Sequence, residues 1–318
     1  MGQFLNNKEP YDKFKTVMNG TYFVDKSEIL EELIPAIQQE QRFFCITRPR
    51  RFGKTVMANM IAAFFENTGE PSLFEHLHIA EYAGYKEQAG KHDVIYIDFS
   101  KMPRECQNYQ EYIDRVQNGL VRDIQEAYPE LVIENNAAVW DILSLVFNQT
   151  GHKFIFVIDE WDAVFHSSFI TEKDKKDYLL FLKLLLKGQS YVELAYMTGV
   201  LPIAKYSDGS ELNMFLEYNM ATRVRFSEYF GFSDEEVDML YQRYLEKTKK
   251  PQITRESLRE WYDGYHTAAG ERLYNPRSVV CALTDNQLSN YWVSSGKYDS
   301  IFTYIQYNVD QIQNDLTL

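Results

Sequence analysis

The chain has 318 residues, of which 45% are hydrophobic and 15% are aromatic, so its composition is that of a folded globular protein and excludes extensive disorder. Its 46 acidic residues outnumber its 33 basic residues and give a formal net charge of −13, which argues against a general nucleic-acid-binding surface. Three cysteines without a C-x-x-C pair support neither a disulfide framework nor a zinc site. No apolar run approaches the roughly 20 residues of a membrane span, and the first residues lack a secretion signal, so we expect a cytoplasmic protein.

Short apolar runs alternate with helical patterns along the chain, which predicts an α/β fold. The runs expected to form strands are residues 42–47, 93–99, 153–158 and 192–198, with a short fifth candidate at 222–226. Helices are expected over residues 56–66, 109–127, 137–147 and 175–187. Because the first and third runs are apolar without alternation, these strands should be covered on both faces, as in a parallel sheet.

The chain from Gly231 onward is expected to form a mainly helical second unit without strong strands. Ser233 is followed three residues later by Glu236, which is the pattern of a helix N-cap with a capping box. Asn275 and Pro276 predict another helix start, because proline is favoured in the first helical turn. The expected domains are therefore a core over 1–230, which includes an entry segment over 1–41, and a helical unit over 231–318.

The loop between the first expected strand and the first helix has residue types that bind phosphate. Backbone N–H groups at a helix N-terminus point toward an anion, and the helix dipole favours negative charge there. Gly53 allows a close approach of the backbone, Lys54 can reach the terminal phosphates, and the Thr55 hydroxyl can bind Mg²⁺. The residues of this loop that we expect to contact nucleotide are Arg48, Pro49, Arg50, Arg51, Phe52, Gly53, Lys54, Thr55 and Val56.

The loop departs from the consensus G-x-x-x-x-G-K-[ST] at its first position, where this chain has Arg48. A basic loop at a helix N-terminus is therefore the alternative interpretation. Three arginines in such a loop oppose the positive end of the helix dipole unless an anion is bound, which favours the phosphate loop.

The third expected strand ends in two carboxylates, Asp159 and Glu160. Side chains alternate along a strand, so these neighbours point in different directions and can take separate roles. Asp159 would bind Mg²⁺, and Glu160 would orient and deprotonate the attacking water. An acidic turn after a core strand is the alternative, but the phosphate loop upstream, in the right order, favours a nucleotide site.

Two other polar residues, Asp162 and Thr198, each have two possible interpretations. Asp162 either supports the metal or caps the next helix, and we expect the cap. Thr198 ends the fourth strand before Gly199, which is where P-loop ATPases with an additional strand place a polar residue that senses the γ-phosphate. A hydroxyl that bonds to backbone is the alternative for Thr198. The expected catalytic residues at this point are Lys54, Glu160 and Thr198.

Several longer strings make the chain similar to a known family. They are residues 22–27 (YFVDKS), 48–55 (RPRRFGKT), 158–162 (IDEWD), 195–203 (AYMTGVLPI), 229–237 (YFGFSDEEV), 261–265 (WYDGY) and 274–279 (YNPRSV). On these strings the chain resembles the bacterial predicted AAA-ATPase family over nearly its whole length, and the arginine at position 48 is usual in that family. The resemblance implies a P-loop NTPase related to archaeal-type and STAND ATPases, with a parallel sheet in the order 5-1-4-3-2, a helical lid, and ATP and Mg²⁺ as ligands.

The resemblance also implies further site residues and a partner. Tyr22 would contact adenine, although the segment around it is equally explained as a helix entry with Ser27 as N-cap. Arg223 or Arg225 would reach the γ-phosphate as an arginine finger, and a solvated strand edge is the alternative. Many family members continue into a restriction-endonuclease-like domain, and this chain ends where we expect that domain to begin.

The leading hypothesis is therefore a Mg²⁺-dependent ATPase or ATP-driven switch that binds ATP and ADP. The alternative is a nucleotide-binding regulatory module with little or no hydrolysis, coupled to a nuclease-like effector. A third hypothesis, a DNA-processing subunit, is disfavoured by the acidic charge balance, so we expect no direct nucleic-acid binding and no membrane partner. Self-association or an effector protein is the expected partnership, and no base-reading motif separates ATP from GTP.

Overall fold

The computed structural model describes residues 2–67, 70–101, 106–134, 137–206, 211–220, 223–267 and 269–291. The chain divides into two compact units between Asn219 and Met220, which precedes the boundary that we expected near residue 230. Among the helices that these ranges include, none is both long enough and apolar enough to cross a membrane.

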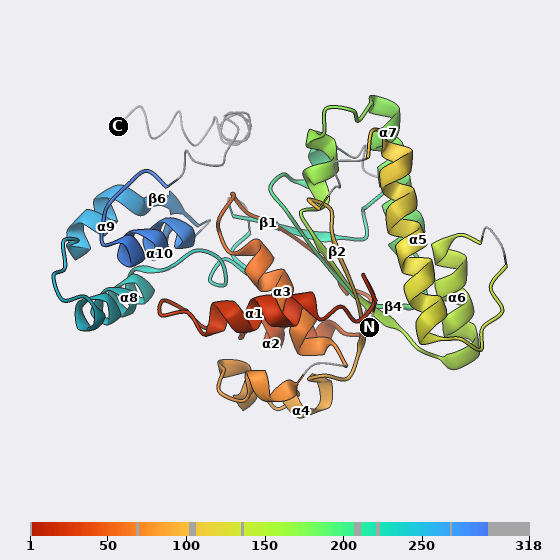
Figure 1. Ribbon diagram of the computed structural model, residues 1–318, viewed down its shortest axis with the longest axis horizontal. Helices are drawn as coiled ribbons and strands as arrows, with labels where there is room; N and C mark the ends of the chain where they lie inside the picture. The colour runs from red at the N-terminus through yellow and green to blue at the C-terminus, as the bar shows by residue number, and fades with distance from the viewer. Residues whose placement is uncertain are drawn as a thin grey trace. The chain divides into compact units, whose positions relative to one another are not determined.

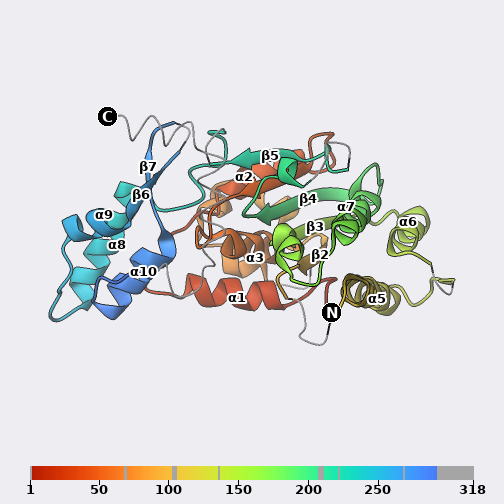
Figure 2. The same ribbon diagram turned by 90° about the horizontal axis from the view of Figure 1, so that it is seen from above.

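The first unit is built on a five-stranded parallel sheet. Its strands are β1 (Phe43–Thr47), β2 (Asp93–Asp98), β3 (Phe154–Asp159), β4 (Val192–Gly199) and β5 (Leu216–Asn219). Their order is β2-β3-β4-β1-β5, which confirms the expected order 5-1-4-3-2. Figure 2 shows β5, β4, β3 and β2 following one another across the sheet. Every residue of β1, β3 and β4 is buried, which is why these runs lack a polar face in the sequence.

Helices cover both faces of this sheet (Figure 1). One face packs against α5 (Tyr109–Ala127), α6 (Val139–Thr150) and α7 (Glu172–Leu186) in a continuous hydrophobic core. The other face packs against α3 (Lys54–Phe65), which contacts α1 (Glu9–Met18). The remaining helical segments of the unit are α2 (Ile29–Leu33), α4 (Tyr85–Gln88), η1 (Ile34–Ala36), η2 (Pro71–Phe74), η3 (His78–Glu81), η4 (Trp161–His166) and η5 (Ile203–Lys205).

The fifth strand lies at Leu216–Asn219, so its expected position at 222–226 is wrong. Phe44 to Thr47 of β1 pair in register with Leu216 to Asn219. Residue 222 is outside the described residues, residues 223–226 form no strand, and Phe226 has a left-handed φ of 67° that a strand does not adopt. The strand is at the border of the sheet and only Tyr218 in it is buried, so its sequence has no apolar run to reveal it.

The second unit combines helices with a small antiparallel sheet. Its elements are α8 (Asp234–Lys247), α9 (Arg255–Tyr262), β6 (Asp263–His266), β7 (Arg272–Tyr274) and α10 (Pro276–Asp285). The expected N-caps are confirmed: Ser233 and Glu236 form a capping box, and the Asn275 side chain accepts the N–H of Ser278. Beside these helices the unit contains two short strands, β6 and β7, which pair with each other and which the expectation of a mainly helical unit without strong strands did not include. Both strands are short, and Gly264 interrupts the β6 pattern.

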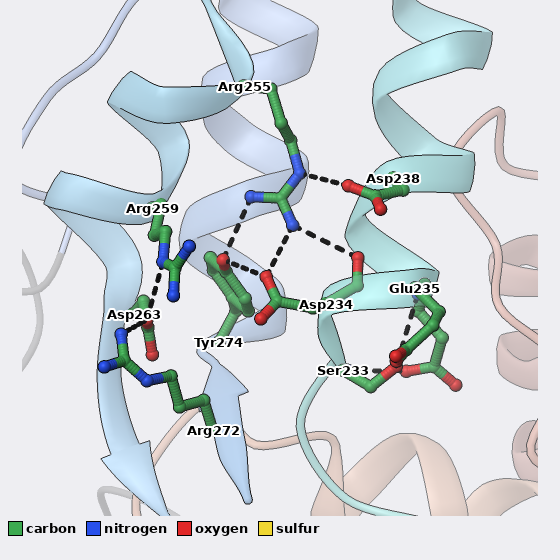
Figure 3. A network of polar contacts seen from close by, with 10 residues as sticks. Ser233, Asp234, Glu235, Asp238, Arg255, Arg259, Asp263, Arg272 and Tyr274 are labelled. Atoms are coloured by element: carbon green, nitrogen blue, oxygen red, sulfur yellow. Dashed lines mark hydrogen bonds and ion pairs between the residues drawn. The ribbon is translucent and has the colours of Figure 1, made fainter.

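A polar network centred on Arg255 joins these elements (Figure 3). Arg255 Nε lies 2.5 Å from Asp238 Oδ1, and its Nη2 lies 2.7 Å from Asp234 Oδ1. Its Nη1 donates to the Tyr274 hydroxyl at 2.9 Å, and that hydroxyl donates to Asp234 at 2.6 Å. Asp234 and Tyr274 come from two of the strings that carry the family resemblance, so those strings contribute to packing of the second unit.

Candidate functional site

The candidate site lies at the carboxyl edge of the sheet, where parallel strands all end. In register, Asp98 is beside Asp159, and Thr47 is beside Gly199. The chain leaves β1 into the expected phosphate loop and leaves β3 into Glu160. Ligands of open α/β sheets bind at this edge. The structure therefore brings together the phosphate loop, Asp159, Glu160 and Thr198.

The phosphate loop ends in an open helix N-terminus. Arg51 and Gly53 both have left-handed backbone, with φ values of 69° and 87°, and α3 begins at Lys54. The N–H of Met57 donates to the Gly53 carbonyl at 2.9 Å, so the N–H groups of the three residues before Met57 precede the helical ladder. Gly53 offers no side-chain cap. These N–H groups form a concentration of positive potential suited to an anion.

Lys54 reaches from this helix start into the site. Its side chain is buried, and its ammonium lies 3.3 Å from the carbonyl oxygen of Pro49 and 3.5 Å from Oε1 of Glu160. Glu160 itself has a left-handed φ of 48°, an unfavourable conformation for a residue with a side chain. The sharp turn after β3 thus presents a carboxylate to the phosphate-loop lysine.

Asp159 is fully buried and only half satisfied. Its Oδ1 accepts the Thr198 hydroxyl at 2.9 Å and the N–H of Glu160 at 3.1 Å. Its Oδ2 is buried and has no hydrogen-bond partner within the described part of the chain. Burial, and after it the charge of Glu160, raise the pKa of Asp159 to about 6, even though hydrogen bonds from the hydroxyls of Thr55 and Thr198 lower it.

This arrangement fits a bound divalent cation. An unpaired buried carboxylate oxygen is costly by itself and is the ligand type that Mg²⁺ prefers. Thr55 provides a hydroxyl at the start of α3. No group of three or more His, Cys, Asp or Glu side chains suited to a metal occurs among the described residues. A metal here would therefore be shared between Asp159, Thr55 and the phosphates of a nucleotide.

Arg48 ties three strand ends together. Its side chain is 1% exposed, and its Nη1 donates to the carbonyls of Thr47 and Tyr218 at 2.8 Å each. Its backbone N–H donates to the carbonyl of Gly199 at 3.1 Å. These bonds join the ends of β1, β4 and β5 and give a physical reason for arginine where the consensus has glycine. Contact of Arg48 with a phosphate stays a prediction.

Asp162 does not cap a helix, so that expectation is wrong. Its carboxylate accepts the backbone N–H groups of Val200 and Leu201, in the loop after β4. Burial and the charge of Glu160 raise the pKa of Asp162, and these two N–H groups lower it. The bond spans 38 and 39 residues of sequence, so no local pattern could reveal it.

The segment around Tyr22 is held by neighbours in the first unit. Asp25 accepts the N–H of His78 at 2.7 Å, and the Ser27 hydroxyl accepts the N–H of Ile79 at 3.1 Å. Ser27 is therefore not the N-cap of α2, whose N-cap position is Glu28. Tyr22 is partly buried, and its contact with adenine stays a prediction.

Three further residues complete the account of the site. Arg223 and Arg225 are exposed and belong to the second unit, and their role as arginine fingers stays a prediction. Lys205, at the end of η5, is a residue that the sequence did not single out. Burial lowers the pKa of Lys205, and the charge of Asp162 raises it, which places this cation within electrostatic range of the turn after β3.

Comparison with known proteins gives a family and a relative. A family model described as Predicted AAA-ATPase matches residues 11–207. A curated protein of Azotobacter chroococcum mcd 1, named "Uncharacterized protein in vnfD 5'region", is 25% identical over 295 residues, which is 86% of this chain and 51% of that protein. The chain therefore spans about half the length of the curated relative that it matches.

Two solved structures resemble the chain more distantly. The Aeropyrum pernix ORC2 protein, solved as ADPNP-ADP complexes, is 12% identical with a TM-score of 0.42, over 87% of this chain and 69% of that one. Cdc6p from Pyrobaculum aerophilum is 11% identical with a TM-score of 0.41, over 89% of this chain and 68% of that one. At such TM-scores neither likeness carries an argument about this chain.

Proposed function

The chain belongs to the predicted AAA-ATPase family, and on that premise we propose that the carboxyl edge of its sheet binds ATP with Mg²⁺ and hydrolyses it. One observation carries the proposal. Asp159 holds a buried oxygen without a hydrogen-bond partner among the described residues, at a strand end, and the hydroxyl of Thr55, in the first turn of α3, lowers the pKa of this carboxyl group. An anion-binding helix start beside an unpaired carboxylate is the pairing that a metal-bound polyphosphate requires.

Nucleotide binding would use the phosphate loop. The N–H groups at the start of α3 would donate to phosphate oxygens, and Lys54 would move from Glu160 to the terminal phosphates. Asp159 and Thr55 are the residues that would hold Mg²⁺, which when bound neutralises charge on the β- and γ-phosphates. Pro49, Arg50, Arg51, Phe52 and Val56 line the same loop and its helix start and complete the proposed nucleotide contacts.

Hydrolysis would use the turn after β3. Glu160 would orient the attacking water and accept its proton at a carboxylate oxygen. This carboxylate lies 3.5 Å from Lys54, so transfer of the lysine to phosphate would leave Glu160 available as a base. Thr198, whose hydroxyl already bonds to Asp159, would report the presence of the γ-phosphate. Arg223 or Arg225 would add charge stabilisation from the second unit.

A regulatory module with little hydrolysis is the second candidate, and the Lys54–Glu160 contact favours it. If Glu160 stayed paired with Lys54, the protein would bind nucleotide without cleaving it. In either case we propose that residues 231–318 act as a helical lid, that the protein is cytoplasmic, and that its signal passes through self-association or to an effector protein. The match covers 51% of the relative, so the rest of that protein leaves room for such an effector in a related chain.

The proposal is tested by measuring ATP binding and phosphate release by the purified chain, with and without Mg²⁺. The wild-type protein should bind ATP and release phosphate only with Mg²⁺. Lys54→Ala should lose ATP binding, whereas Lys183→Ala, which removes a lysine on α7, should not. Absence of Mg²⁺-dependent binding, or binding that survives Lys54→Ala, would refute the proposal. Tight binding with ATP left intact after long incubation would favour the regulatory module.

A further inference from the structure

Asp162 is a buried carboxylate that the proposed chemistry does not use. It is 1% exposed and lies in η4, which begins directly after Glu160. Its Oδ1 and Oδ2 accept the N–H of Val200 at 3.2 and 3.1 Å, and its Oδ2 accepts the N–H of Leu201 at 2.9 Å. These are consecutive N–H groups at the point where the chain leaves β4. The side chain therefore joins the turn after β3 to the loop after β4.

Gly199 makes this junction tight. A Cβ at that position would lie 2.4 Å from Cδ1 of Trp161 and 2.8 Å from Oδ1 of Asp162, closer than Cβ atoms approach their neighbours. Trp161 is fully buried and has no room to retreat without disturbing the core. Glycine thus allows the end of β4 to lie directly against the turn that carries Glu160.

The junction is adjacent to each part of the proposed site. Thr198, one residue before Gly199, donates its hydroxyl to Asp159. The carbonyl of Gly199 accepts the N–H of Arg48, the first residue of the phosphate loop. A shift of the β4 end relative to the β3 turn would therefore move the Thr198 hydroxyl away from Asp159.

We propose that Asp162 is a positioning residue that holds the Thr198 end of β4 against the Asp159–Glu160 turn during turnover. The inference rests on the proposed ATPase function and deepens it. A buried carboxylate that accepts two N–H groups makes strong, charge-assisted bonds. In Asp162→Asn, the NH₂ group that replaces Oδ1 cannot accept the N–H of Val200, and the negative charge that strengthens both bonds to Oδ2 is lost. Loss of such an outer support typically lowers activity about 10- to 100-fold.

The chain offers a matched control for this substitution. Asp123 on α5 is also buried, and its Oδ2 accepts two consecutive backbone N–H groups, those of Phe4 at 2.6 Å and Leu5 at 3.1 Å. This second junction fastens the N-terminal segment beside β2, and the Asp123 carboxylate accepts its hydrogen bonds from that segment. We expect Asp123→Asn to lower stability and leave kcat unchanged, and Asp162→Asn to lower kcat about 10- to 100-fold while ATP affinity stays the same. Equal kcat values in the two folded variants would overturn the inference.

A double substitution separates positioning from general damage. If Asp162 acts through Thr198, adding Asp162→Asn to Thr198→Val should lower kcat no further than the more severe single variant does. Multiplying losses would overturn the inference. A wild-type protein that binds and hydrolyses no ATP would refute the proposed function and this inference with it, whereas an active wild type with additive variants refutes the inference alone.

A second variant covers the case in which Asp162→Asn does not fold. Gly199→Ala opens the same junction by steric contact, and Gly264→Ala is its control, because a Cβ on Gly264 would meet nothing within 4 Å. We expect Gly199→Ala to lower kcat in the same range as Asp162→Asn and without additivity to Thr198→Val. A folded Gly199→Ala protein with wild-type kcat would overturn the inference.

Discussion

Two buried carboxylates at opposite ends of one parallel sheet, Glu193 and Asp159, differ in how their oxygens are satisfied. At the amino end, the ring nitrogens of His92 lie 2.8 Å from Glu193 Oε2 and 2.8 Å from Gln88 Oε1. Gln38 donates to the other carboxylate oxygen of Glu193, also at 2.8 Å. At the carboxyl end, Asp159 is buried more deeply, and yet its Oδ2 has no partner within the described residues.

The pKa values of these two carboxyl groups shift in opposite directions. Burial raises the pKa of Glu193, but hydrogen bonds from His92 and Gln38 outweigh it, so the pKa lies below the ordinary value. Burial and Glu160 raise the pKa of Asp159 to about 6. The Glu193 cluster therefore stabilises the fold, while Asp159 holds a carboxylate oxygen that the described residues do not satisfy. Strain and perturbed ionisation of this kind concentrate at functional sites.

The largest effect is expected from Glu160→Gln. The variant keeps the shape of the side chain and removes the base, so turnover of ATP should fall about 10²- to 10⁴-fold while ATP binding remains. Glu172→Gln, at the exposed start of α7, should leave turnover unchanged. Phosphate release under saturating ATP measures both variants. Full turnover in a folded Glu160→Gln protein would remove Glu160 from the mechanism.

Asp159→Asn should act on affinity and stability in opposite directions. Affinity for ATP in the presence of Mg²⁺ should fall at least about tenfold, because the unpaired carboxylate oxygen is lost. The ligand-free protein should become more stable by about 1 kcal/mol, because an unsatisfied buried charge is removed. Calorimetric titration and urea unfolding measure the two quantities.

The neighbouring strand end supplies the control for Asp159→Asn. Asp98 lies beside Asp159 in register, but its Oδ1 already accepts the N–H and the hydroxyl of Ser100. Asp98→Asn should therefore leave the Mg²⁺-dependent affinity nearly unchanged. If the two variants behaved alike, the contrast between satisfied and unsatisfied carboxylates would have no functional meaning.

Glu193→Gln should show the opposite pattern at the amino end. It should lower the free energy of unfolding by about 1–2 kcal/mol through loss of the bonds with His92, and leave ATP turnover unchanged. Urea unfolding and phosphate release measure these outcomes. A loss of turnover at unchanged stability would contradict the division of roles between the two ends.

The pH dependence of that difference has a defined sign. The pKa of Glu193 is lower in the folded chain than its ordinary value of 4.5, so its ionised form stabilises the fold. The stability difference between wild type and Glu193→Gln should be fully present above that ordinary value. It should shrink as the pH falls through the lower folded pKa. Urea unfolding of both proteins as a function of pH measures it, and a difference that grows toward acid would contradict the assignment.

The smallest effect is expected from Arg48→Lys. This variant tests whether Arg48 supports the strand ends or contacts a phosphate. Lysine cannot reproduce the guanidinium geometry that bonds the carbonyls of Thr47 and Tyr218, so stability should fall by about 1 kcal/mol. Affinity for ATP should change little. A large loss of affinity at unchanged stability would instead support the phosphate contact that the sequence predicts for Arg48.

The sequence predicts those features of the fold and the site that arise from contiguous residues. The buried runs of β1 and β3, the glycine and lysine of the phosphate loop, and the acidic end of β3 are visible because each is contiguous. β5 escaped because a half-buried border strand has no apolar run. The sequence did not predict the hydrogen bonds of Arg48 and Asp162, because their partners, such as Tyr218 and Val200, are far away in sequence. The roles of such residues depend on contacts that form only in the folded chain.

The central claim is that the carboxyl edge is completed by Mg²⁺ and ATP. The most direct test is the free energy of unfolding of the wild-type chain with and without a non-hydrolysable ATP analogue and Mg²⁺. A ligand at 100 times its Kd should raise that free energy by about 2.7 kcal/mol, and the gain should shrink in Asp159→Asn at the same ligand concentration. An unchanged free energy in the wild-type protein at millimolar ligand would contradict the account.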